Sequence, residues 1–176
     1  QLFTLTGEAL GRGGDYADIF FEYATLEEML LKDGRVATVG STVDYEVGIR
    51  VIKGEQTGYA YAESTDMAQM MGAARSAAAI ADGFAQNFTI QNVTKVRAGS
   101  FYTGEDCWKG VAPDYRISFL NSLENMVRQR DERVVKVVAR IATSYGRSLF
   151  FNSLGEMAED AGPLASVVLQ VVMHEG

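Results

Sequence analysis

The residues with the clearest chemical potential are His174 and Glu175, close to the end of the chain. They match the first two letters of an H-E-x-x-H motif, in which two histidines on one helix face bind zinc and the glutamate activates water. His174 is the only histidine in the sequence, and the preceding VVLQVVM is typical of a strand. We therefore predict a hairpin turn at 174–176 rather than a metal site.

Other groups that could catalyse a reaction lack the partners they need. Cys107 is the single cysteine, has no base near it in the sequence and stands beside Trp108, so we interpret it as a packing residue. A serine nucleophile needs a histidine base. Adjacent carboxylates such as Glu27 and Glu28 point to opposite faces of a strand. The sequence predicts no catalytic, cofactor-binding or metal-binding residue in these 176 residues.

Two tyrosines suggest a binding site instead. Tyr59 and Tyr61 alternate in TGYAYA, so both would lie on one face of a strand. An antiparallel sheet with an exposed edge can accept an extended peptide as an added strand. Tyr59 and Tyr61 are therefore candidate peptide-binding residues, and the alternative is that both rings only pack against neighbouring side chains.

Composition limits the partners that this chain would bind. Its net charge is −7, and an acidic surface repels nucleic-acid phosphates and anionic membranes. The basic cluster from Arg128 to Lys136 is best interpreted as charge at a helix C-terminus and on an exposed strand. No apolar run is long enough to span a bilayer, and one cysteine suits a reducing compartment. We expect no nucleic-acid partner and no membrane partner.

These residues need a sheet and helices to position them. Apolar periodicity and the turn signal Asp33-Gly34 predict a five-stranded antiparallel meander in residues 15–63. The strands expected there are 19–23, 26–32, 35–39, 47–52 and 57–62, with 26–32 folding back on the first. Helical patterns cover the first dozen residues, 65–82 and 113–130.

The C-terminal part repeats the strand pattern of the N-terminal part. Its expected strands are 135–141, 148–152, a short strand after the turn at 153–155, and 165–173. In this quasi-repeat Gly34 corresponds to Gly155 and Gly54 to Gly176, so we expect the chain to end within a sheet. The predicted fold class is α+β, with two quasi-repeated antiparallel meanders and two main helices, in one domain (1–176) with a candidate sub-boundary at 83–112.

Several blocks of the sequence are similar to a known family. DYADIFFE, KDGRV and VGIRVIKGEQTGYAYA resemble the N-terminal region of the TldD/PmbA zinc metallopeptidases, also called the modulator of DNA gyrase family. A weaker resemblance continues through residues 128–172. Where family members tend to have RPL, this chain has Gly162-Pro163-Leu164.

The resemblance implies a cytoplasmic zinc metallopeptidase that cleaves extended or unfolded peptides, as a homodimer or with a TldE-like partner subunit. The family's zinc motif belongs to a C-terminal domain, which is absent from these residues. This segment would then help to enclose the substrate chamber and to dimerise, and would be inactive alone. The wording GEQTGYAYA favours the TldD type. The alternative is a non-catalytic, TldE/PmbA-like subunit that binds peptides or a partner.

Overall fold

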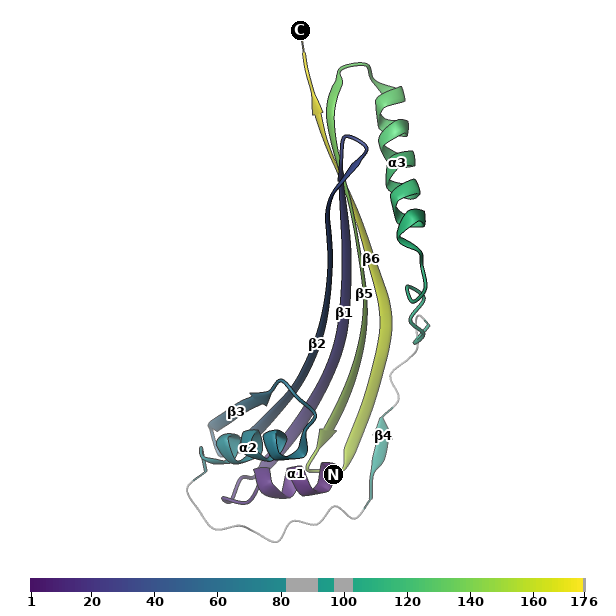
Figure 1. Cartoon of the computed structure of the whole chain (residues 1–176). Helices are drawn as coiled ribbons and strands as arrows, with labels where there is room; N and C mark the ends of the chain where they lie inside the picture. Colours follow the sequence, from purple (N-terminus) through teal and green to yellow (C-terminus); the bar gives the residue numbers. More distant parts are fainter. Residues whose placement is uncertain (82–91, 97–102, 176) are drawn as a thin grey trace. The chain divides into compact units, whose positions relative to one another are not determined.

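The computed structural model describes residues 1–81, 92–96 and 103–175. Figure 1 labels the elements along the chain. They are α1 (Leu2–Ala9), β1 (Tyr16–Lys32), β2 (Arg35–Lys53), β3 (Gln56–Ala62), α2 (Met67–Ala78), β4 (Thr94–Val96), α3 (Pro113–Arg130), β5 (Val134–Asn152) and β6 (Glu156–Met173). The predicted α+β class is confirmed, and so are the three predicted helices.

The described strands form one sheet in the order β3-β2-β1-β5-β6-β4. β2 and β3 pair antiparallel, with Lys53 opposite Gln56 at the turn. β4 pairs parallel with β6, with Thr94 opposite Glu156. The sheet is therefore mixed, whereas we predicted antiparallel pairing throughout. The difference arises because β4 lies in a stretch that shows no strand periodicity.

The predicted number of strands was wrong because neighbouring segments merge into long strands. Residues 26–32 continue β1 instead of folding back, so residues 15–63 hold three strands rather than five. Ala17 and Ile19 are fully buried, and Met29 and Leu31 are buried at positions of the same parity. One uninterrupted strand therefore presents all four to the same face. In the same way the expected C-terminal strands join into β5 and β6.

Two long hairpins carry the predicted quasi-repeat. β1 and β2 meet at Asp33-Gly34, and β5 and β6 meet at residues 153–155. Gly34 and Gly155 both have positive φ, 74° and 84°, as tight turns between twisted strands require. The correspondence of Gly34 with Gly155 is thus confirmed at the level of backbone conformation. Gly176 lies outside the described residues, so the turn at 174–176 stays a prediction.

The chain forms two compact units, each built from three separate stretches. Unit 1 contains Gln1–Ala24, Asp44–Tyr102 and Gly146–Ala161, and unit 2 contains Thr25–Val43, Thr103–Tyr145 and Gly162–Gly176. The candidate sub-boundary at 83–112 falls in part on residues that the structure does not describe, 83–91 and 97–102, and it stays a prediction.

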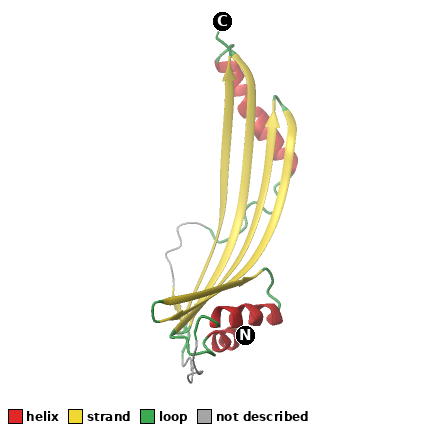
Figure 2. Ribbon diagram, turned by 90° about the vertical axis from the view of Figure 1, so that its left-hand side faces the viewer, coloured by secondary structure: helices red, strands yellow, loops and turns green. Residues whose placement is uncertain are grey.

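Helices α1 and α2 pack against the sheet strands of unit 1 (Figure 2). The Asp66 side chain caps α2 by accepting hydrogen bonds from the amides of Ala68 and Gln69, both at 3.1 Å. The alanine and methionine side chains of α2 fill the core, as predicted. The buried members of this core are Leu5, Ala9, Leu10, Ala17, Ile19, Val47, Ile49, Val51, Ala62, Met70, Ala73, Ala74 and Ala77.

Helix α3 provides the core of unit 2. Pro113 occupies its first turn, where a missing amide proton costs nothing. Leu120 is fully buried, and Ile117 and Leu123 lie beside it. These side chains pack against a small apolar cluster on β1 and β5, made of Met29, Leu31, Ala139 and Ile141.

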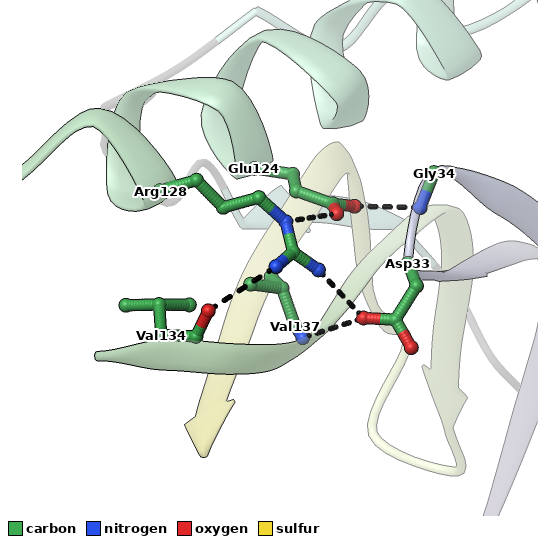
Figure 3. Close-up of polar contacts among 6 residues, drawn as sticks. All are labelled: Asp33, Gly34, Glu124, Arg128, Val134 and Val137. Carbon is green, nitrogen blue, oxygen red and sulfur yellow. Dashed lines mark hydrogen bonds and ion pairs between the residues drawn. The ribbon is translucent and has the colours of Figure 1, made fainter. Parts of the chain in front are cut away.

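A polar network joins α3, the β1–β2 turn and β5 in unit 2 (Figure 3). Glu124 accepts a hydrogen bond from the Gly34 amide at 2.7 Å and one from Arg128 Nε at 2.8 Å. Arg128 Nη2 in turn donates to Asp33 Oδ1 at 2.7 Å. Asp33 Oδ1 also accepts from the Val137 amide at 3.0 Å. Helix α3 thus binds both turn residues, Asp33 and Gly34, and strand β5 binds Asp33 as well.

Candidate functional site

The two predicted peptide-binding residues lie side by side on an open face of β3. The side chains of Tyr59 and Tyr61 are 65% and 63% exposed. Ala60 and Ala62 alternate with them and pack into the core formed with α2. The prediction that both tyrosines share one face is therefore confirmed. Neither ring is buried in the core. Their role in binding stays a prediction.

Gly58 explains how α2 approaches β3 closely enough to cover its other face. A Cβ atom at this position would overlap the carbonyl oxygen of Ala77 and contact Ile80. Only glycine leaves room for helix backbone at this distance. The close packing of α2 fixes the direction of β3, and with it the outward direction of Tyr59 and Tyr61.

The neighbouring residues of β2 complete the tyrosine face, which we define as Tyr59, Tyr61, Gly48 and Arg50. Arg50 lies opposite Tyr59, and Gly48 lies opposite Tyr61. Residues directly opposite in an antiparallel pair point to the same side of the sheet. A Cβ at Gly48 would stand 2.5 Å from the Tyr59 hydroxyl oxygen, so this ring lies diagonally over the glycine.

A buried carboxylate fixes the guanidinium of the tyrosine face. Arg50 Nε donates to Asp18 Oδ2 at 3.0 Å, and Nη2 donates to the same oxygen. The Asp18 side chain is 9% exposed, whereas that of Arg50 is 46% exposed. The hydrogen bond to Asp18 and its charge raise the pKa of Arg50, so this group stays cationic. Burial raises the pKa of the adjacent Tyr16.

The tyrosine face combines three features of peptide recognition. β3 is an outer strand of the described sheet, so one of its edges has no described strand beside it. Such an edge offers amide and carbonyl groups to an extended chain. Two exposed aromatic rings and a guanidinium with a solvent-accessible side lie next to it. The four residues of the tyrosine face include no nucleophile and no general base, so the chemistry that they offer is that of binding.

The sequence did not single out Arg50 and Asp18. A signal for them was present, because Asp18 and Arg50 each occupy the outward position between two apolar residues of an alternating strand. Two opposite charges on the same type of strand face predict a cross-strand pair. Pairing them required knowing that β1 and β2 are neighbours with this register.

A shallow depression beside α1 and α2 is a weaker candidate. Its main charged pair is Glu8 with Arg75, whose Nε lies 2.7 Å from Glu8 Oε1. The guanidinium of Arg75 therefore already has an anionic partner within the protein. The lining residues are Gly7, Glu8, Gly11, Arg12, Arg75 and Ala78. None of these side chains is a nucleophile, and the single carboxylate is already paired.

His174 and Cys107 lie in unit 2, away from any catalytic arrangement in the described part of the chain. The His174 amide donates to the Arg133 carbonyl at 2.9 Å, directly after the end of β6. The strand predicted before His174 is confirmed. Cys107 is exposed rather than packed as we predicted, because it lies in the loop before α3.

The described residues contain neither a cluster of metal-binding side chains nor a helix that could span a membrane. Nowhere in residues 1–81, 92–96 and 103–175 do three or more histidine, cysteine, aspartate or glutamate side chains gather closely enough to bind a metal ion. None of the described helices combines the length and apolar character needed to cross a bilayer.

Two family models match successive parts of the chain. Residues 17–81 match PmbA/TldA metallopeptidase domain 1, and residues 108–176 match the PmbA/TldA metallopeptidase central domain. Among curated proteins, the metalloprotease TldD homologue of Haemophilus influenzae is 28% identical over 93% of this chain. That of Buchnera aphidicola from Schizaphis graminum is 27% identical over 92%. The chain covers 34% and 33% of these relatives, about a third of their length.

Solved structures with the same fold cover nearly the whole chain. TldE from Thermococcus kodakarensis has a TM-score of 0.74 and 17% identity, and covers 100% of this chain and 40% of its own. A protein of Bacteroides thetaiotaomicron, described as a candidate modulator of DNA gyrase, has a TM-score of 0.75 and 12% identity. It covers 98% of this chain and 40% of its own. With the two matched domains, these findings show that the chain belongs to the TldD/PmbA metallopeptidase family and represents its N-terminal region.

Proposed function

We propose that this chain is the N-terminal region of a TldD-type zinc metallopeptidase that cleaves extended or unfolded peptides. The match to two successive family domains supports the peptidase assignment, and the TldD homologues among the relatives support the type. In this proposal the full-length protein is cytoplasmic and works as a homodimer or with a TldE-like subunit. Its zinc would activate the attacking water in a later domain.

The described residues contribute binding rather than catalysis in this proposal. Their role is to help enclose the substrate chamber, to present a peptide in an extended conformation and to form part of the dimer interface. The observation that carries the binding role is the tyrosine face beside the outer edge of β3. Backbone hydrogen bonds along that edge would be tolerant of sequence, as a peptidase for unfolded chains requires. Tyr59 and Tyr61 would contact alternate side chains of the peptide.

Replacing both tyrosines tests this role in the full-length protein. We expect Tyr59→Ala together with Tyr61→Ala to raise the KM for an unfolded protein such as reduced casein by about tenfold, the effect of losing roughly 1.4 kcal/mol of binding. The kcat should stay unchanged, because binding that is equal in the ground and transition states affects KM alone. Initial rates over a range of substrate concentrations measure both parameters.

The matched control is Tyr115→Ala on α3, because Tyr115 is also strongly exposed, at 70%. This variant should keep the wild-type KM. If Tyr115→Ala raised the KM as much as the double variant does, the binding role of the tyrosine face would be contradicted. An unchanged KM in the double variant would also contradict it. Zinc-dependent cleavage by residues 1–176 alone, abolished by His174→Ala, would contradict the non-catalytic role of this segment.

The coding sequence beyond Gly176 separates the peptidase from the alternative. A histidine-rich metal motif in a later domain supports the peptidase, and chelator-sensitive cleavage of unfolded protein would then be expected. A following domain without such a motif would identify a non-catalytic, TldE/PmbA-like subunit that binds peptides or a partner.

A further inference from the structure

Arg116 is a buried cation whose hydrogen bonds are not satisfied. It lies one turn into α3, and its side chain is 10% exposed. Its Nε and Nη2 atoms are shielded from solvent and have no hydrogen-bond partner in the described part of the chain. A guanidinium keeps its charge in proteins, and a buried charge without hydrogen bonds is costly. Arg116 therefore lacks an acceptor that matches its donors.

Glu27 of β1 is the carboxylate that forms an ion pair with Arg116 in the described structure. Glu27 Oε2 lies beside Arg116 Nη2, but the geometry of this contact is not that of a hydrogen bond. The Glu27 side chain is 46% exposed, so it can turn into solvent and leave the guanidinium. Asp114 is exposed and two residues from Arg116, which places it on a different side of α3. Glu27 thus balances the charge of Arg116 without satisfying its donors.

Backbone hydrogen bonds fix the register between β1 and β5. The Asp33 amide donates to the Val137 carbonyl at 3.0 Å, and the Ser153 amide donates to the Ala17 carbonyl at 2.8 Å. Residues 17 and 33 are 16 positions apart, and so are residues 137 and 153. Equal spacing on the two strands means that they pair one to one between these bonds, without a net bulge.

This register places a second unpartnered group directly opposite Glu27. Thr143 is six residues after the bond at residue 137, and Glu27 is six residues before the bond at residue 33. Residues directly opposite in an antiparallel pair point to the same side of the sheet. Thr143 is 2% exposed, and its Oγ1 has no hydrogen-bond partner among the described residues. Its hydroxyl can donate a hydrogen bond to a group beside Arg116.

The surroundings of these groups are weakly polar. The next pair along the strands, Met29 and Ile141, belongs to the core of unit 2. On the other side Tyr145 is 9% exposed, and its hydroxyl donates to the Gly104 carbonyl at 2.9 Å. Low polarity strengthens the hydrogen bonds between a guanidinium and an anionic acceptor. The Nε and Nη2 edge of a guanidinium fits two oxygens of one carboxylate or phosphate.

We propose that Arg116 and Thr143 bind a small oxyanion, a carboxylate or a phosphate group, and that Glu27 competes with it. The oxyanion accepts hydrogen bonds from Nε and Nη2 of Arg116 and from the Thr143 hydroxyl, while Glu27 turns into solvent. All three residues belong to unit 2, whereas the tyrosine face belongs to unit 1. The proposed site therefore does not depend on the peptidase function.

Removing the charge of Glu27 tests the site in the full-length protein. Isothermal titration calorimetry with sodium phosphate and, separately, with sodium acetate measures the affinity, and sodium chloride keeps the ionic strength constant. We expect Glu27→Gln to bind one of these anions about tenfold more tightly than wild type, because a competing and repelling carboxylate is lost. Tighter binding of phosphate identifies a phosphate group as the ligand, and tighter binding of acetate identifies a carboxylate.

Glu28→Gln is the matched control, because Glu28 also lies on β1 and pairs with an arginine. Its partner Arg140 is 39% exposed, so water can hydrate this guanidinium when Glu28 is changed. Glu28→Gln should bind both anions as wild type does. Urea unfolding gives a second measurement. The anion that binds should restore the urea midpoint that Glu27→Gln loses, and it should not raise the midpoint of Glu28→Gln.

Two further variants remove the proposed donors. Arg116→Met should abolish binding, and Thr143→Val should weaken it by about tenfold, the effect of one hydrogen bond to a charged group. Thr143→Val keeps the shape of the side chain, so it decides the outcome if Arg116→Met does not fold.

Three results would overturn the proposal. These are no binding of either anion by Glu27→Gln, equal affinities in Glu27→Gln and Glu28→Gln, or an affinity that Thr143→Val and Arg116→Met leave unchanged. The calorimetry needs no cleavage, so each of these results leaves the peptidase proposal intact. Loss of peptide cleavage in the full-length protein would likewise leave the oxyanion site intact.

Discussion

Asp33 lies at the centre of the polar network of unit 2, at an unusual backbone position. Its φ is 48°, the only positive value for a non-glycine residue among those described. Aspartate and asparagine tolerate this conformation better than other side chains. The hydrogen bond from the Val137 amide lowers the pKa of Asp33, and the charge of Arg128 lowers it further.

We expect Asp33→Asn to flatten the acid dependence of stability. A carboxylate with a lowered folded pKa contributes stability above its unfolded pKa of about 3.9, and the contribution is lost as the pH falls through the folded value. The variant should therefore unfold at lower urea concentration than wild type at pH 7. The two midpoints should converge below about pH 4. Urea titrations between pH 7 and pH 2, followed by circular dichroism, measure the difference.

Asp44→Asn is the control for a general charge effect. Asp44 is exposed and has no ion pair in the described structure. Its substitution should leave the urea midpoint nearly unchanged at every pH. A midpoint difference for Asp33→Asn that persisted undiminished at pH 2 would contradict the role of the carboxylate charge.

At the scale of elements, the packing of α2 on β3 depends on the absence of a side chain at Gly58. We expect Gly58→Ala to destabilise the protein by about 1–3 kcal/mol, because the new methyl group meets helix backbone that cannot rotate away. The same variant should also disturb the tyrosine face, since α2 positions β3. Urea unfolding measures the first effect, and the KM for unfolded protein measures the second.

Gly72→Ala in α2 is the control, and we expect it to stabilise the protein rather than destabilise it. No atom lies within 4 Å of a Cβ placed at this position. Replacing a helical glycine by alanine stabilises by roughly 0.5–1 kcal/mol. A stabilising Gly58→Ala would mean that α2 approaches β3 less closely than described.

The sequence predicted where helices lie more accurately than where strands end. Asp66 as a cap and the alanine positions of α2 carry a local signal, and both predictions are correct. The break expected between residues 23 and 26 was wrong, although Ile19 and Met29 have the same parity and already indicated a continuous strand. Residues 35–46 of β2 are mostly exposed, so no burial pattern marked them as one strand with 47–53.

The candidate site was predictable only where it depends on a local sequence pattern. Alternation alone puts Tyr59 and Tyr61 on one face, because this depends on a single strand. Arg50 and Asp18 come from two strands, and their contact depends on a pairing register that no local pattern specifies. Long-range pairing was also needed to show that β6 lies between β5 and β4.

At the scale of the whole molecule, charge argues against binding to nucleic acid, although one solved structure of this fold is described as a candidate modulator of DNA gyrase. The net charge is −7, and in the basic cluster Arg128 and Arg133 are paired with carboxylates. We expect a dissociation constant for duplex DNA weaker than about 10⁻⁴ M at physiological salt.

Fluorescence anisotropy of a labelled duplex measures this affinity. The titration is run at 50 mM and 200 mM salt, because phosphate contacts give binding that falls steeply with salt. Micromolar binding with a steep salt dependence would contradict the expectation. In that case Arg130→Ala and Lys136→Ala would be the first variants to test, since both belong to the basic cluster.

The position of β5 next to β1 has a consequence for synthesis on the ribosome. The Ala17 amide bonds to Ser153, which is 136 residues further along the chain. At translation rates of roughly 5–20 residues per second, that partner emerges about 7–27 s later. During this interval the β1–β2 hairpin can form through its local turn, while the other side of β1 stays open. A nascent chain with such an open strand is a natural client for a ribosome-associated chaperone.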